Sequence, residues 1–475
     1  MLNHHIFRFP LHLGVLHGLA VAAGLALYVV SSHGLRQRRN ASAAIAWVVS
    51  LALIPYLALP LYLMFGTRKL AGHSRQATDR VRAVGVIGED AWLERLAEAM
   101  QIAPAAAYRS LSIHDDGAAA LAALVETIES ATRTLDVCTF LIGSDALGDA
   151  IERQLIARAA AGVRVRLLLD GIGRYVGGRF DLRPLRRGGV EVALFVPPLH
   201  RPGRGRANLR NHRKVVIADG SRVWCGGRNL AAEYFVGAPG VAAWRDLSFG
   251  FEGDLVGAAS AQFDADWTLA TGSLAAPTLL RSSTAVNAQP QPQPKAMAYA
   301  RAQLIPSGPD QADDTVHALL VTACFNARTR IVAVSPYFVP DDTLLLALVL
   351  AARRDVAVDL LVPRRSNHRL ADIARHRSLR ALAEAGARVW LLPDMIHAKA
   401  IVVDGFAFAG SANLDARSLF LNYEFMVAFY DRADVERFAD WIARQQRDAT
   451  PYMPHEPGLM KDLAEGLILW AAFQL

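Results

Sequence analysis

Two copies of one short pattern contain the residues best suited to chemistry in this sequence. Each copy has His-x-Lys, an aspartate five residues after the lysine, and then a glycine-rich turn that ends in asparagine. The first copy contains His212, Lys214, Asp219, Gly226, Gly227 and Asn229, and the second contains His397, Lys399, Asp404, Gly410, Ser411 and Asn413. Histidine can act as a nucleophile or move a proton, and lysine can hold a phosphate oxygen. The pattern therefore indicates chemistry at a phosphate group.

The two lysines are informative because this chain rarely uses lysine. Only five of its 51 basic residues are lysines, and two of these five stand in the repeated pattern. With 14 histidines in the chain, chance would give about 0.15 His-x-Lys pairs if positions were independent. A compact ammonium suits a point contact to phosphate, whereas arginine suits a bidentate one. Both copies are therefore predicted to be functional.

Each copy of the pattern is predicted to begin a β-strand. β-Branched residues follow each lysine: Val215, Val216 and Ile217 in the first copy, and Ile401, Val402 and Val403 in the second. On a strand, residues i and i+2 point to the same face, so the histidine and the lysine can reach one ligand together. A metal site is the main alternative for the two histidines, but an ammonium on the same face opposes a divalent cation. We therefore expect neither a metal nor another cofactor.

The remaining residues of the pattern have different expected roles. Asn229, Asn413 and Ser411 can donate hydrogen bonds and are predicted to bind phosphate oxygens. Asp219 and Asp404 complete the two motifs, and we count them with the catalytic set. Because they fall at the turn after the strand, we interpret them as structural or charge-balancing rather than chemical. Glycine at position 227 leaves the first copy without the hydroxyl that Ser411 supplies in the second.

Two histidines that meet at one phosphodiester suggest a mechanism in two steps. One neutral imidazole attacks phosphorus and forms a phosphohistidine, while the other, protonated, donates a proton to the leaving alkoxide. That second histidine then deprotonates an alcohol or water, which attacks the phosphohistidine. The lysines and asparagines stabilise the negative charge on the equatorial oxygens.

The sequence after residue 100 consists of two similar halves that predict an α/β fold. In each half apolar, strand-like runs such as 163–170 and 356–362 alternate with helical patterns, which is typical of βαβ units around mixed β-sheets flanked by helices. We predict a first lobe at residues 105–280, a Pro/Gln-rich linker at 281–299 and a second lobe at 300–450. The tail at 451–475 is predicted either to pack on the domain or to lie at a membrane surface as an amphipathic helix.

Residues 1–70 are predicted to form a transmembrane hairpin with spans near 13–32 and 43–65, followed by a connecting segment at 71–104. Phe9–Leu35 and Asn40–Thr67 contain no Asp, Glu, Lys or Arg, and a span needs about 20 apolar residues. A cleaved signal peptide is the alternative for the first segment. Six basic residues flank the ends of the hairpin and three lie in its linker. The positive-inside rule therefore predicts a cytoplasmic main domain.

The composition narrows the classes of protein that the chain can belong to. Hydrophobic residues make up 53% and charged residues 20%, which excludes a largely disordered chain. Three widely spaced cysteines argue against a disulfide framework and exclude a cysteine-based zinc site. Residues 1–82 carry a net charge of +8, so the rest of the chain is nearly neutral. We therefore expect a membrane, and no nucleic acid, as the partner.

The twin motifs resemble those of the phospholipase D superfamily, and the chain is similar to its bacterial cardiolipin synthases. Further similarity lies in Trp244-Arg-Asp246, Ser307-Gly-Pro-Asp310, Pro336-Tyr-Phe-Val-Pro-Asp341 and Asn413-Leu-Asp-Ala-Arg-Ser418 with Asn422-Tyr-Glu424. In this superfamily a carboxylate downstream of each motif orients its histidine. The resemblance therefore implies that Asp246 orients His212 and that Glu424 orients His397.

The resemblance also implies a reaction and a location. One phosphatidylglycerol would give its phosphatidyl group to the enzyme and a second would accept it, which releases cardiolipin and glycerol at the bacterial inner membrane. The assignment usual in the family makes His212 the nucleophile and His397 the acid and base, although the two copies are nearly symmetric. The oligomeric state stays open.

Other functions remain as alternatives at the level of sequence. A phospholipase D or a transphosphatidylase would use water, a small alcohol or phosphatidylethanolamine as the acceptor. A nuclease shares the twin motif, but the membrane hairpin argues against it, and two intact motifs argue against a non-enzymatic scaffold. Five arginines precede or enter the first motif, where they could hold lipid head groups or form a solvated loop: Arg201, Arg204, Arg206, Arg210 and Arg213.

Overall fold

The computed structural model describes residues 8–34, 41–66, 92–197, 208–238, 240–272 and 300–471. The chain divides into two compact units, which we describe separately. The first contains Met1–Ala83 with two short later segments, and the second contains Val84–Phe195, Arg210–Gly308 and Asp313–Leu475. The predicted linker at 281–299 and most of the connecting segment lie outside the described residues.

The described N-terminal unit consists of three apolar helices, α1 (Arg8–Gly34), α2 (Ala41–Leu53) and α3 (Pro55–Phe65). Within α1, Gly14–Ser32 is long and apolar enough to cross a membrane, whereas α2 and α3 are shorter apolar helices. Helix α1 packs against the other two, and Gly24 leaves room for the buried side chain of Leu51. The unit thus has the composition of a membrane anchor.

The second predicted span, at 43–65, is not one continuous helix. The helix breaks at Ile54, whose backbone is non-helical with φ −134° and ψ 56°. Pro55 follows, and proline both lacks an N–H donor and disfavours the helical conformation in the residue before it. The segment of the second predicted span therefore forms two helices, α2 and α3, and the physical cause is the proline at the start of α3.

The second unit is an α/β structure in which, across the described residues, fifteen strands form one continuous sheet. Its first lobe contributes β1 (Ala106–His114), β2 (Thr134–Thr139), β3 (Arg164–Asp170), β4 (Glu191–Phe195), β5 (Val215–Ala218), β6 (Arg222–Gly226) and β7 (Ser248–Glu252). These strands lie in the order β1-β7-β6-β5-β2-β3-β4. The pairs β2–β3 and β3–β4 are parallel and the others are antiparallel.

The second lobe repeats this order as β8-β16-β14-β13-β9-β11-β12, with a short strand β17 added at the edge. Its strands in the sheet are β8 (Ala300–Ser307), β9 (Arg330–Val334), β11 (Ala357–Pro363), β12 (Arg388–Leu392), β13 (Ala400–Val403), β14 (Phe406–Gly410), β16 (Glu424–Phe429) and β17 (Thr450–Pro451). Antiparallel pairing of β1 with β8 joins the two lobes edge to edge. The prediction of two similar lobes with mixed sheets is thus confirmed.

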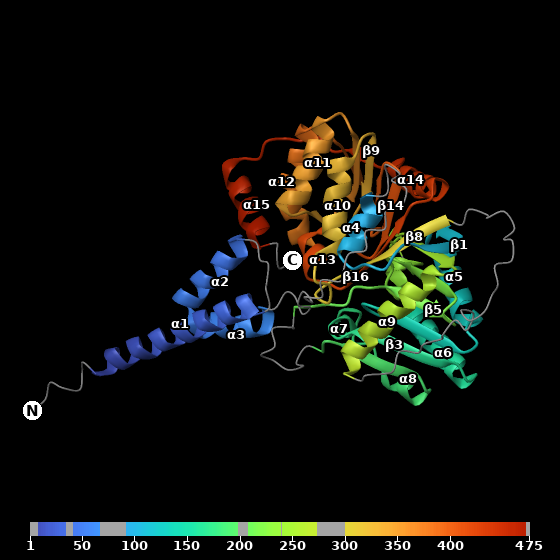
Figure 1. The fold of residues 1–475 in the computed structure, drawn as a ribbon, viewed down its shortest axis with the longest axis horizontal. Coiled ribbons are helices and arrows are strands. Elements are labelled where there is room, and N and C mark those ends of the chain that lie inside the picture. The colour runs from blue at the N-terminus through green and yellow to red at the C-terminus, as the bar shows by residue number, and fades with distance from the viewer. Residues whose placement is uncertain are drawn as a thin grey trace, which may run out of the picture. The chain divides into compact units, whose positions relative to one another are not determined.

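Helices flank the sheet in both lobes (Figure 1). The first lobe has α5 (Gly117–Ser130), α6 (Ala146–Ala160), α7 (Gly173–Val176), α8 (Arg183–Arg187), the 3₁₀ helix η1 (Ala232–Tyr234) and α9 (Leu255–Thr271). The second lobe has α10 (Thr315–Asn326), α11 (Asp342–Arg353), α12 (Arg369–Glu384), α13 (Ala416–Phe420), α14 (Arg432–Gln446) and α15 (Leu459–Ala471), with a small ribbon of β10 (Phe338–Val339) and β15 (Leu414–Asp415). Each lobe has its own apolar core.

Two elements from the ends of the chain pack on the second lobe. Helix α4 (Trp92–Ala99) precedes the first lobe in sequence, yet its Leu93 and Ala97 lie in the core of the second. Helix α15 packs on α12, where Arg377 pairs with Asp462 at 2.8 Å. Helix α15 therefore packs on the domain, which is one of the two arrangements predicted for the tail.

Candidate active site

The backbone of each motif histidine, His212 and His397, is hydrogen-bonded to the backbone of the opposite lobe. The N–H of His212 donates to the carbonyl of Tyr423 at 2.9 Å, and the N–H of His397 donates to the carbonyl of Arg245 at 2.6 Å. Strands β5 and β13 begin directly after the two motif lysines, as the β-branched residues predicted. The edge-to-edge joining of the lobes thus brings both motifs to one place.

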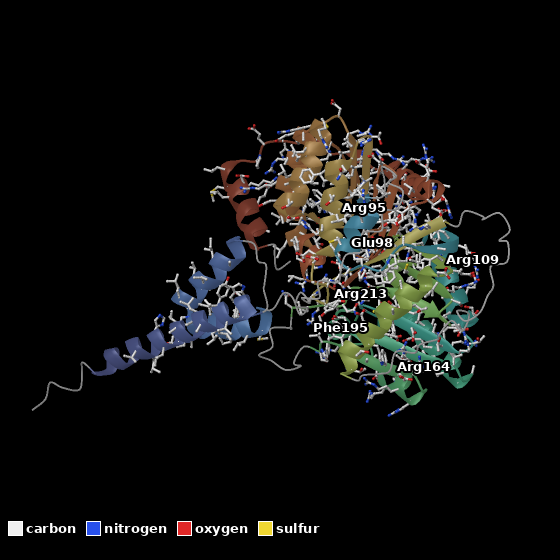
Figure 2. All side chains as sticks on the ribbon, viewed as in Figure 1. Arg95, Glu98, Arg109, Arg164, Phe195 and Arg213 are labelled. Atoms are coloured by element: carbon white, nitrogen blue, oxygen red, sulfur yellow. The ribbon has the colours of Figure 1, made fainter. Side chains whose placement is uncertain are left out.

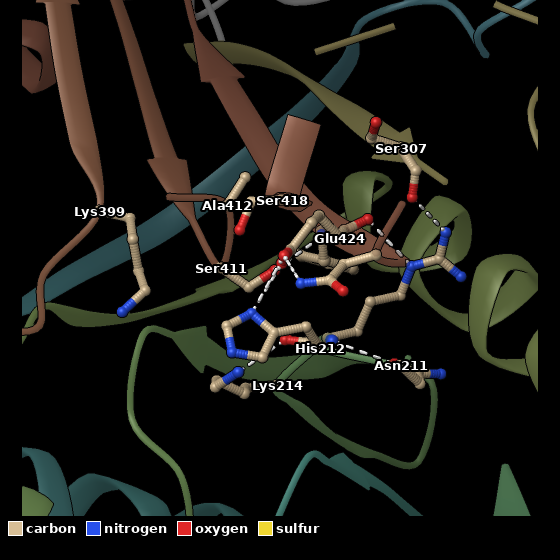
Figure 3. A network of polar contacts seen from close by, with 12 residues as sticks. Asn211, His212, Lys214, Ser307, Lys399, Ser411, Ala412, Ser418 and Glu424 are labelled. Atoms are coloured by element: carbon tan, nitrogen blue, oxygen red, sulfur yellow. Dashed lines mark hydrogen bonds and ion pairs between the residues drawn. The ribbon is translucent and has the colours of Figure 1, made fainter. Parts of the chain in front are cut away.

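The histidine side chains are also paired across the lobes. Nδ1 of His212 lies 3.0 Å from Glu424 Oε1, and Nδ1 of His397 lies 2.7 Å from Asp246 Oδ2. Figure 3 shows the imidazole of His212 directed toward the Glu424 carboxylate, which strand β16 supplies. The expected pairing of each histidine with the carboxylate downstream in its own half was therefore wrong. The two acidic residues are the right ones, but the near-twofold arrangement of the lobes exchanges them.

This pairing favours one tautomer of both imidazoles, and at His397 the Nζ of Lys399 also lies 2.7 Å from Nδ1. An ionised carboxylate only accepts hydrogen bonds, so Nδ1 carries the proton and Nε2 keeps its lone pair. Burial acts to raise the pKa of both carboxyl groups, but the nearby histidines and lysines outweigh it, so the pKa of Asp246 and that of Glu424 lie below their usual values. Both acids therefore stay ionised, and each imidazole presents a nucleophilic or basic Nε2.

Burial and neighbouring ammonium groups keep the imidazoles neutral in the free protein. Burial, helped by the charge of Lys399, lowers the pKa of His397 to about 3. Burial also lowers the pKa of His212, with a further contribution from Lys214. A bound phosphodiester anion would oppose these effects and favour protonation of one histidine.

The two lysines lie beside their histidines, and their expected contact with one shared ligand stays a prediction. The ammonium of Lys214 donates to the carbonyl of His212 at 2.7 Å, and that of Lys399 donates to the carbonyl of His397. Both side chains are buried. Burial lowers the pKa of Lys214 to about 8 and that of Lys399 to about 7. Each lysine therefore loses its charge close to neutral pH, and a phosphate anion would favour its ammonium form.

The glycine-rich turns differ between the lobes for a steric reason. Ser411 Oγ donates to Glu424 Oε2 at 2.6 Å and accepts from the N–H of Phe425, so it holds the carboxylate rather than facing a ligand. At position 227 a Cβ atom would lie 2.2 Å from Asp246 Oδ1, which leaves room only for glycine. Asp246 Oδ1 instead accepts a hydrogen bond from the backbone N–H of Leu247 at 2.7 Å.

A cavity of about 410 Å³ opens in front of the two histidines. His212, His397, Asn229 and Asn413 all line it, and the buried Oδ1 atoms of both asparagines have no hydrogen-bond partner in the described protein. The Nδ2 of Asn229 donates to the hydroxyl of Tyr234 at 2.8 Å. The two asparagines expected at the phosphate are thus next to the histidines.

The motif aspartates lie away from this cavity. Asp219 accepts the backbone N–H groups of Thr132, Arg133 and Thr134 at 2.7–2.9 Å, and Asp404 does the same for residues 328–330. Both aspartates have positive φ, at 53° and 47°, in the turns that follow β5 and β13. They hold the starts of β2 and β9, and these contacts fit the structural interpretation of the two aspartates.

Several cavity residues were missed by the motif analysis. Rings surround the imidazoles edge-on, with Phe140 5.5 Å from His212 and Tyr234 5.1 Å from His397 between ring centroids. Aromatic rings have no spacing rule that would identify them in the sequence.

The arginines near the first motif lie in different places. Arg210 lines the cavity, whereas Arg213 is buried at the junction of the lobes (Figure 2), where it pairs with Asp266. The other three arginines before the motif lie outside the described residues.

The described residues contain no group of three or more His, Cys, Asp or Glu side chains placed to hold a metal ion. Two histidines that line one cavity, each with a buried lysine beside it, are suited to chemistry on a phosphate diester. Two repeated α/β lobes that build one such site define the class of phospholipase D enzymes.

Comparisons with known proteins agree with this class and narrow it. A family model described as "Cardiolipin synthase, PLD-like domain" matches residues 124–267 and 320–445, and a "Phospholipase_D-nuclease N-terminal" model matches residues 21–66. Cardiolipin synthase A of Pseudomonas entomophila (strain L48) is 33% identical over 459 residues, which cover 92% of this chain and 91% of that protein. Cardiolipin synthase A of Pseudomonas aeruginosa (strain LESB58) is 34% identical over 447 residues, covering 89% of each. The chain belongs to the cardiolipin synthase family of phosphatidyltransferases.

One solved structure extends the comparison to the fold. Phosphatidylserine synthase of Haemophilus influenzae Rd KW20 has a TM-score of 0.58 and 14% sequence identity. The match covers 81% of this chain and all of that one. The two proteins therefore share the two-lobed fold.

Proposed function

We propose that this protein makes cardiolipin and glycerol from two molecules of phosphatidylglycerol through a covalent phosphohistidine. The observation that carries the proposal is the pair of Nε2 atoms, one from each lobe, at a single cavity. Each imidazole is held through Nδ1 by a carboxylate of the opposite lobe. In-line displacement at phosphorus needs a nucleophile on one side and a proton donor on the other.

The first step transfers the phosphatidyl group to the enzyme. Nε2 of His212 attacks phosphorus and forms a P–N bond, and the P–O bond to the departing glycerol breaks. His397, protonated at Nε2, gives its proton to that oxygen. Following the usual family assignment, we give His212 the role of nucleophile and His397 that of acid and base.

In the second step His397 acts as a base, and the hydroxyl of a second lipid displaces His212 from phosphorus. His397 takes the proton from a primary hydroxyl of the second phosphatidylglycerol, whose oxygen attacks phosphorus while the P–N bond breaks. Lys214, Lys399, Asn229 and Asn413 are proposed to hold the equatorial oxygens, where charge builds up. Glu424, supported by Ser411, and Asp246 are proposed as positioning residues for the two imidazoles.

The shape of the cavity supports a lipid headgroup as the substrate. Besides the polar residues of the motifs, the cavity is lined by an apolar set: Phe140, Leu141, Ile172, Val176 and Val339. A volume of about 410 Å³ holds a headgroup but not two acyl chains. The chains would have to extend outside the protein, which fits an enzyme that works at a bilayer surface.

We also propose a topology for the whole chain. The apolar helices α1 and α2–α3 would anchor it in the bacterial inner membrane as a multi-pass protein, with the catalytic unit in the cytoplasm. The greater number of basic residues at the hairpin ends than in its linker supports this orientation. The division into a hairpin at 1–70, lobes at 105–280 and 300–450, and a tail at 451–475 belongs to the same proposal.

Product analysis of the purified protein tests the function. In vesicles of phosphatidylglycerol alone, we expect cardiolipin and glycerol in equal amounts, and the same product when phosphatidylethanolamine is added. Both His212→Ala and His397→Ala should lower the rate by at least about 10³-fold, since each removes a group that the chemistry needs. Phosphatidic acid as the sole product, or a new lipid made from phosphatidylethanolamine, would contradict the proposed acceptor.

A further inference from the structure

A second polar cluster lines the cavity beside the residues already assigned to the reacting phosphate. It consists of Arg210, Arg417, Ser418 and Asn422, and we call it the second cluster. None of these residues is part of the repeated motif. The second lobe supplies three of them from one short segment, and the first lobe supplies Arg210.

Local structure fixes the position of this cluster. Asp415 caps α13 by accepting the N–H of Ser418 at 2.7 Å, and the carbonyl of Arg417 accepts the N–H of Asn422 at 3.0 Å. The N–H of Tyr423 donates to the carbonyl of Arg210 at 2.9 Å, which joins the two lobes here. Glu424, the partner of His212, follows immediately. The second cluster is therefore held close to the catalytic histidine of the first lobe.

Two buried polar atoms of the cluster lack a hydrogen-bond partner in the described protein. These are the Oγ of Ser418 and the Oδ1 of Asn422, in residues that are 1% and 6% exposed. A buried polar atom without a partner is costly, so such atoms at a cavity wall point to a ligand. A hydroxyl and an amide oxygen together suit a ligand that carries hydroxyl groups, which can donate to both.

The two arginines place two cationic groups at the same wall, where Asp170 lies beside Arg210 and Asp415, which also lines the cavity, acts on Arg417. Arg210 is 4% exposed and lies 3.4 Å from Asp170, while Arg417 is half-buried. Burial, together with the charge of Arg210, lowers the pKa of Arg417. Arginine suits a phosphate in particular, and two guanidinium groups at one wall can both donate to an anionic ligand.

We infer that the second cluster binds the phosphate and glycerol of the acceptor lipid, and so selects an anionic phosphoglycerol headgroup over water and glycerol. This inference rests on the proposed function. The reaction brings two phosphates to the site, and the motif residues serve only the one that is attacked. The acceptor's own phosphate lies one glycerol away from its attacking hydroxyl. An ethanolamine headgroup would place an ammonium near the two arginines, which repel it.

The chemical step is that of the second half-reaction. The acceptor hydroxyl gives its proton to the base histidine, its oxygen bonds to phosphorus, and the P–N bond to the nucleophilic histidine breaks. Free glycerol can undergo the same step and regenerate phosphatidylglycerol, but it has no phosphate. Loss of the second cluster should therefore slow the reaction with the lipid acceptor and leave the reaction with glycerol nearly unchanged.

The test compares two acceptors on the same enzyme. The full-length protein in phosphatidylglycerol vesicles is given labelled glycerol, and both cardiolipin formation and label incorporated into phosphatidylglycerol are measured. For Arg417→Gln we expect cardiolipin formation to fall about 10- to 100-fold, which is the usual effect of losing a charged hydrogen bond. Glycerol exchange should change by less than about threefold, since it uses the same covalent intermediate.

Three further variants make the result specific. Arg417→Lys should recover part of the cardiolipin activity because it keeps the charge. Ser418→Ala removes a hydroxyl that has no protein partner, so the fold should persist while cardiolipin formation falls about 3- to 10-fold. Arg353→Gln, at the exposed end of α11, makes the same charge change elsewhere and should leave both reactions unaltered.

The outcomes separate this inference from the proposed function. Equal loss of both reactions in Arg417→Gln and in Ser418→Ala, or no loss in either variant, would overturn the acceptor site. A wild-type protein that exchanges glycerol but makes no cardiolipin would instead overturn the proposed function itself.

Discussion

At the scale of single residues, the chemistry depends on how burial and charge set the protonation of four groups. The two imidazoles are neutral in the free protein because they are buried next to ammonium groups. The same burial makes the lysines unusually acidic, with the pKa of Lys399 lowered to about 7 and that of Lys214 to about 8. A small change in pH near neutrality therefore changes the charge that meets the substrate.

The pH dependence of the reaction follows from these lysines. An amine is charged below its pKa, so the positive charge at the site is lost as pH rises through 7 to 8. We expect kcat/KM for phosphatidylglycerol to decrease over this range, and kcat, which reports the lipid-bound enzyme, to decrease at higher pH. Initial rates from pH 5.5 to 9.5 at constant ionic strength measure both. A kcat/KM that stays flat to pH 9 would show that the lysines do not titrate here.

At the scale of the elements, each motif aspartate holds the loop before a neighbouring strand. Asp219 accepts three backbone N–H groups and the hydroxyl of Thr132. These contacts outweigh the effect of its partial burial and lower its pKa to about 2. Its contribution to stability is thus complete above the pKa of about 4 in the unfolded chain, and it is lost as pH falls toward 2.

Replacing this aspartate should affect stability rather than chemistry. For Asp219→Ala at pH 7 we expect the free energy of unfolding to fall by about 1–3 kcal/mol, because a charged acceptor of several hydrogen bonds is removed. The kcat of the folded variant should stay within about twofold of wild type, as the residue does not line the cavity. Thermal unfolding and rate assays in the same detergent measure the two effects. Asp254→Ala, at a helix start without a side-chain cap, is the matched control.

A large loss of kcat in correctly folded Asp219→Ala, at an unchanged unfolding temperature, would contradict this assignment. The equivalent change at Asp404 should give the same pattern, because that residue makes matching contacts in the second lobe.

The sequence could predict the parts of the site that lie close together along the chain. Their spacing identified His212 with Lys214 and His397 with Lys399, although the four residues lie just before strands β5 and β13 rather than on them. The pairing of each histidine with Asp246 or Glu424 of the other lobe could not be predicted from spacing, because it depends on how the two lobes join at the edges of their sheets. The glycine at 227 looked like a lost hydroxyl, whereas the position of Asp246 leaves no space for one.

At the scale of the whole molecule, neither lobe contains a complete half of the site. The opposite lobe supplies the carboxylate that orients each imidazole and the carbonyl that accepts the backbone N–H of the same histidine. Arg245 strengthens this junction by pairing with Asp394 and Asp448. The similarity of the halves was visible in the sequence, but the single continuous sheet through β1 and β8 was not, because strand order between repeats has no sequence signal.

The central claim is that two histidines from different lobes act on one phosphorus, one as nucleophile and the other as acid and base. A phosphatidyl ester of 4-nitrophenol tests it, because nitrophenolate leaves without a proton donor. In His397→Ala we expect a burst of one nitrophenolate per protein and a stable phosphohistidine at position 212, identified by mass spectrometry. In His212→Ala we expect no burst. A burst in both variants, a burst in neither, or a covalent adduct on any residue other than these histidines would contradict the account.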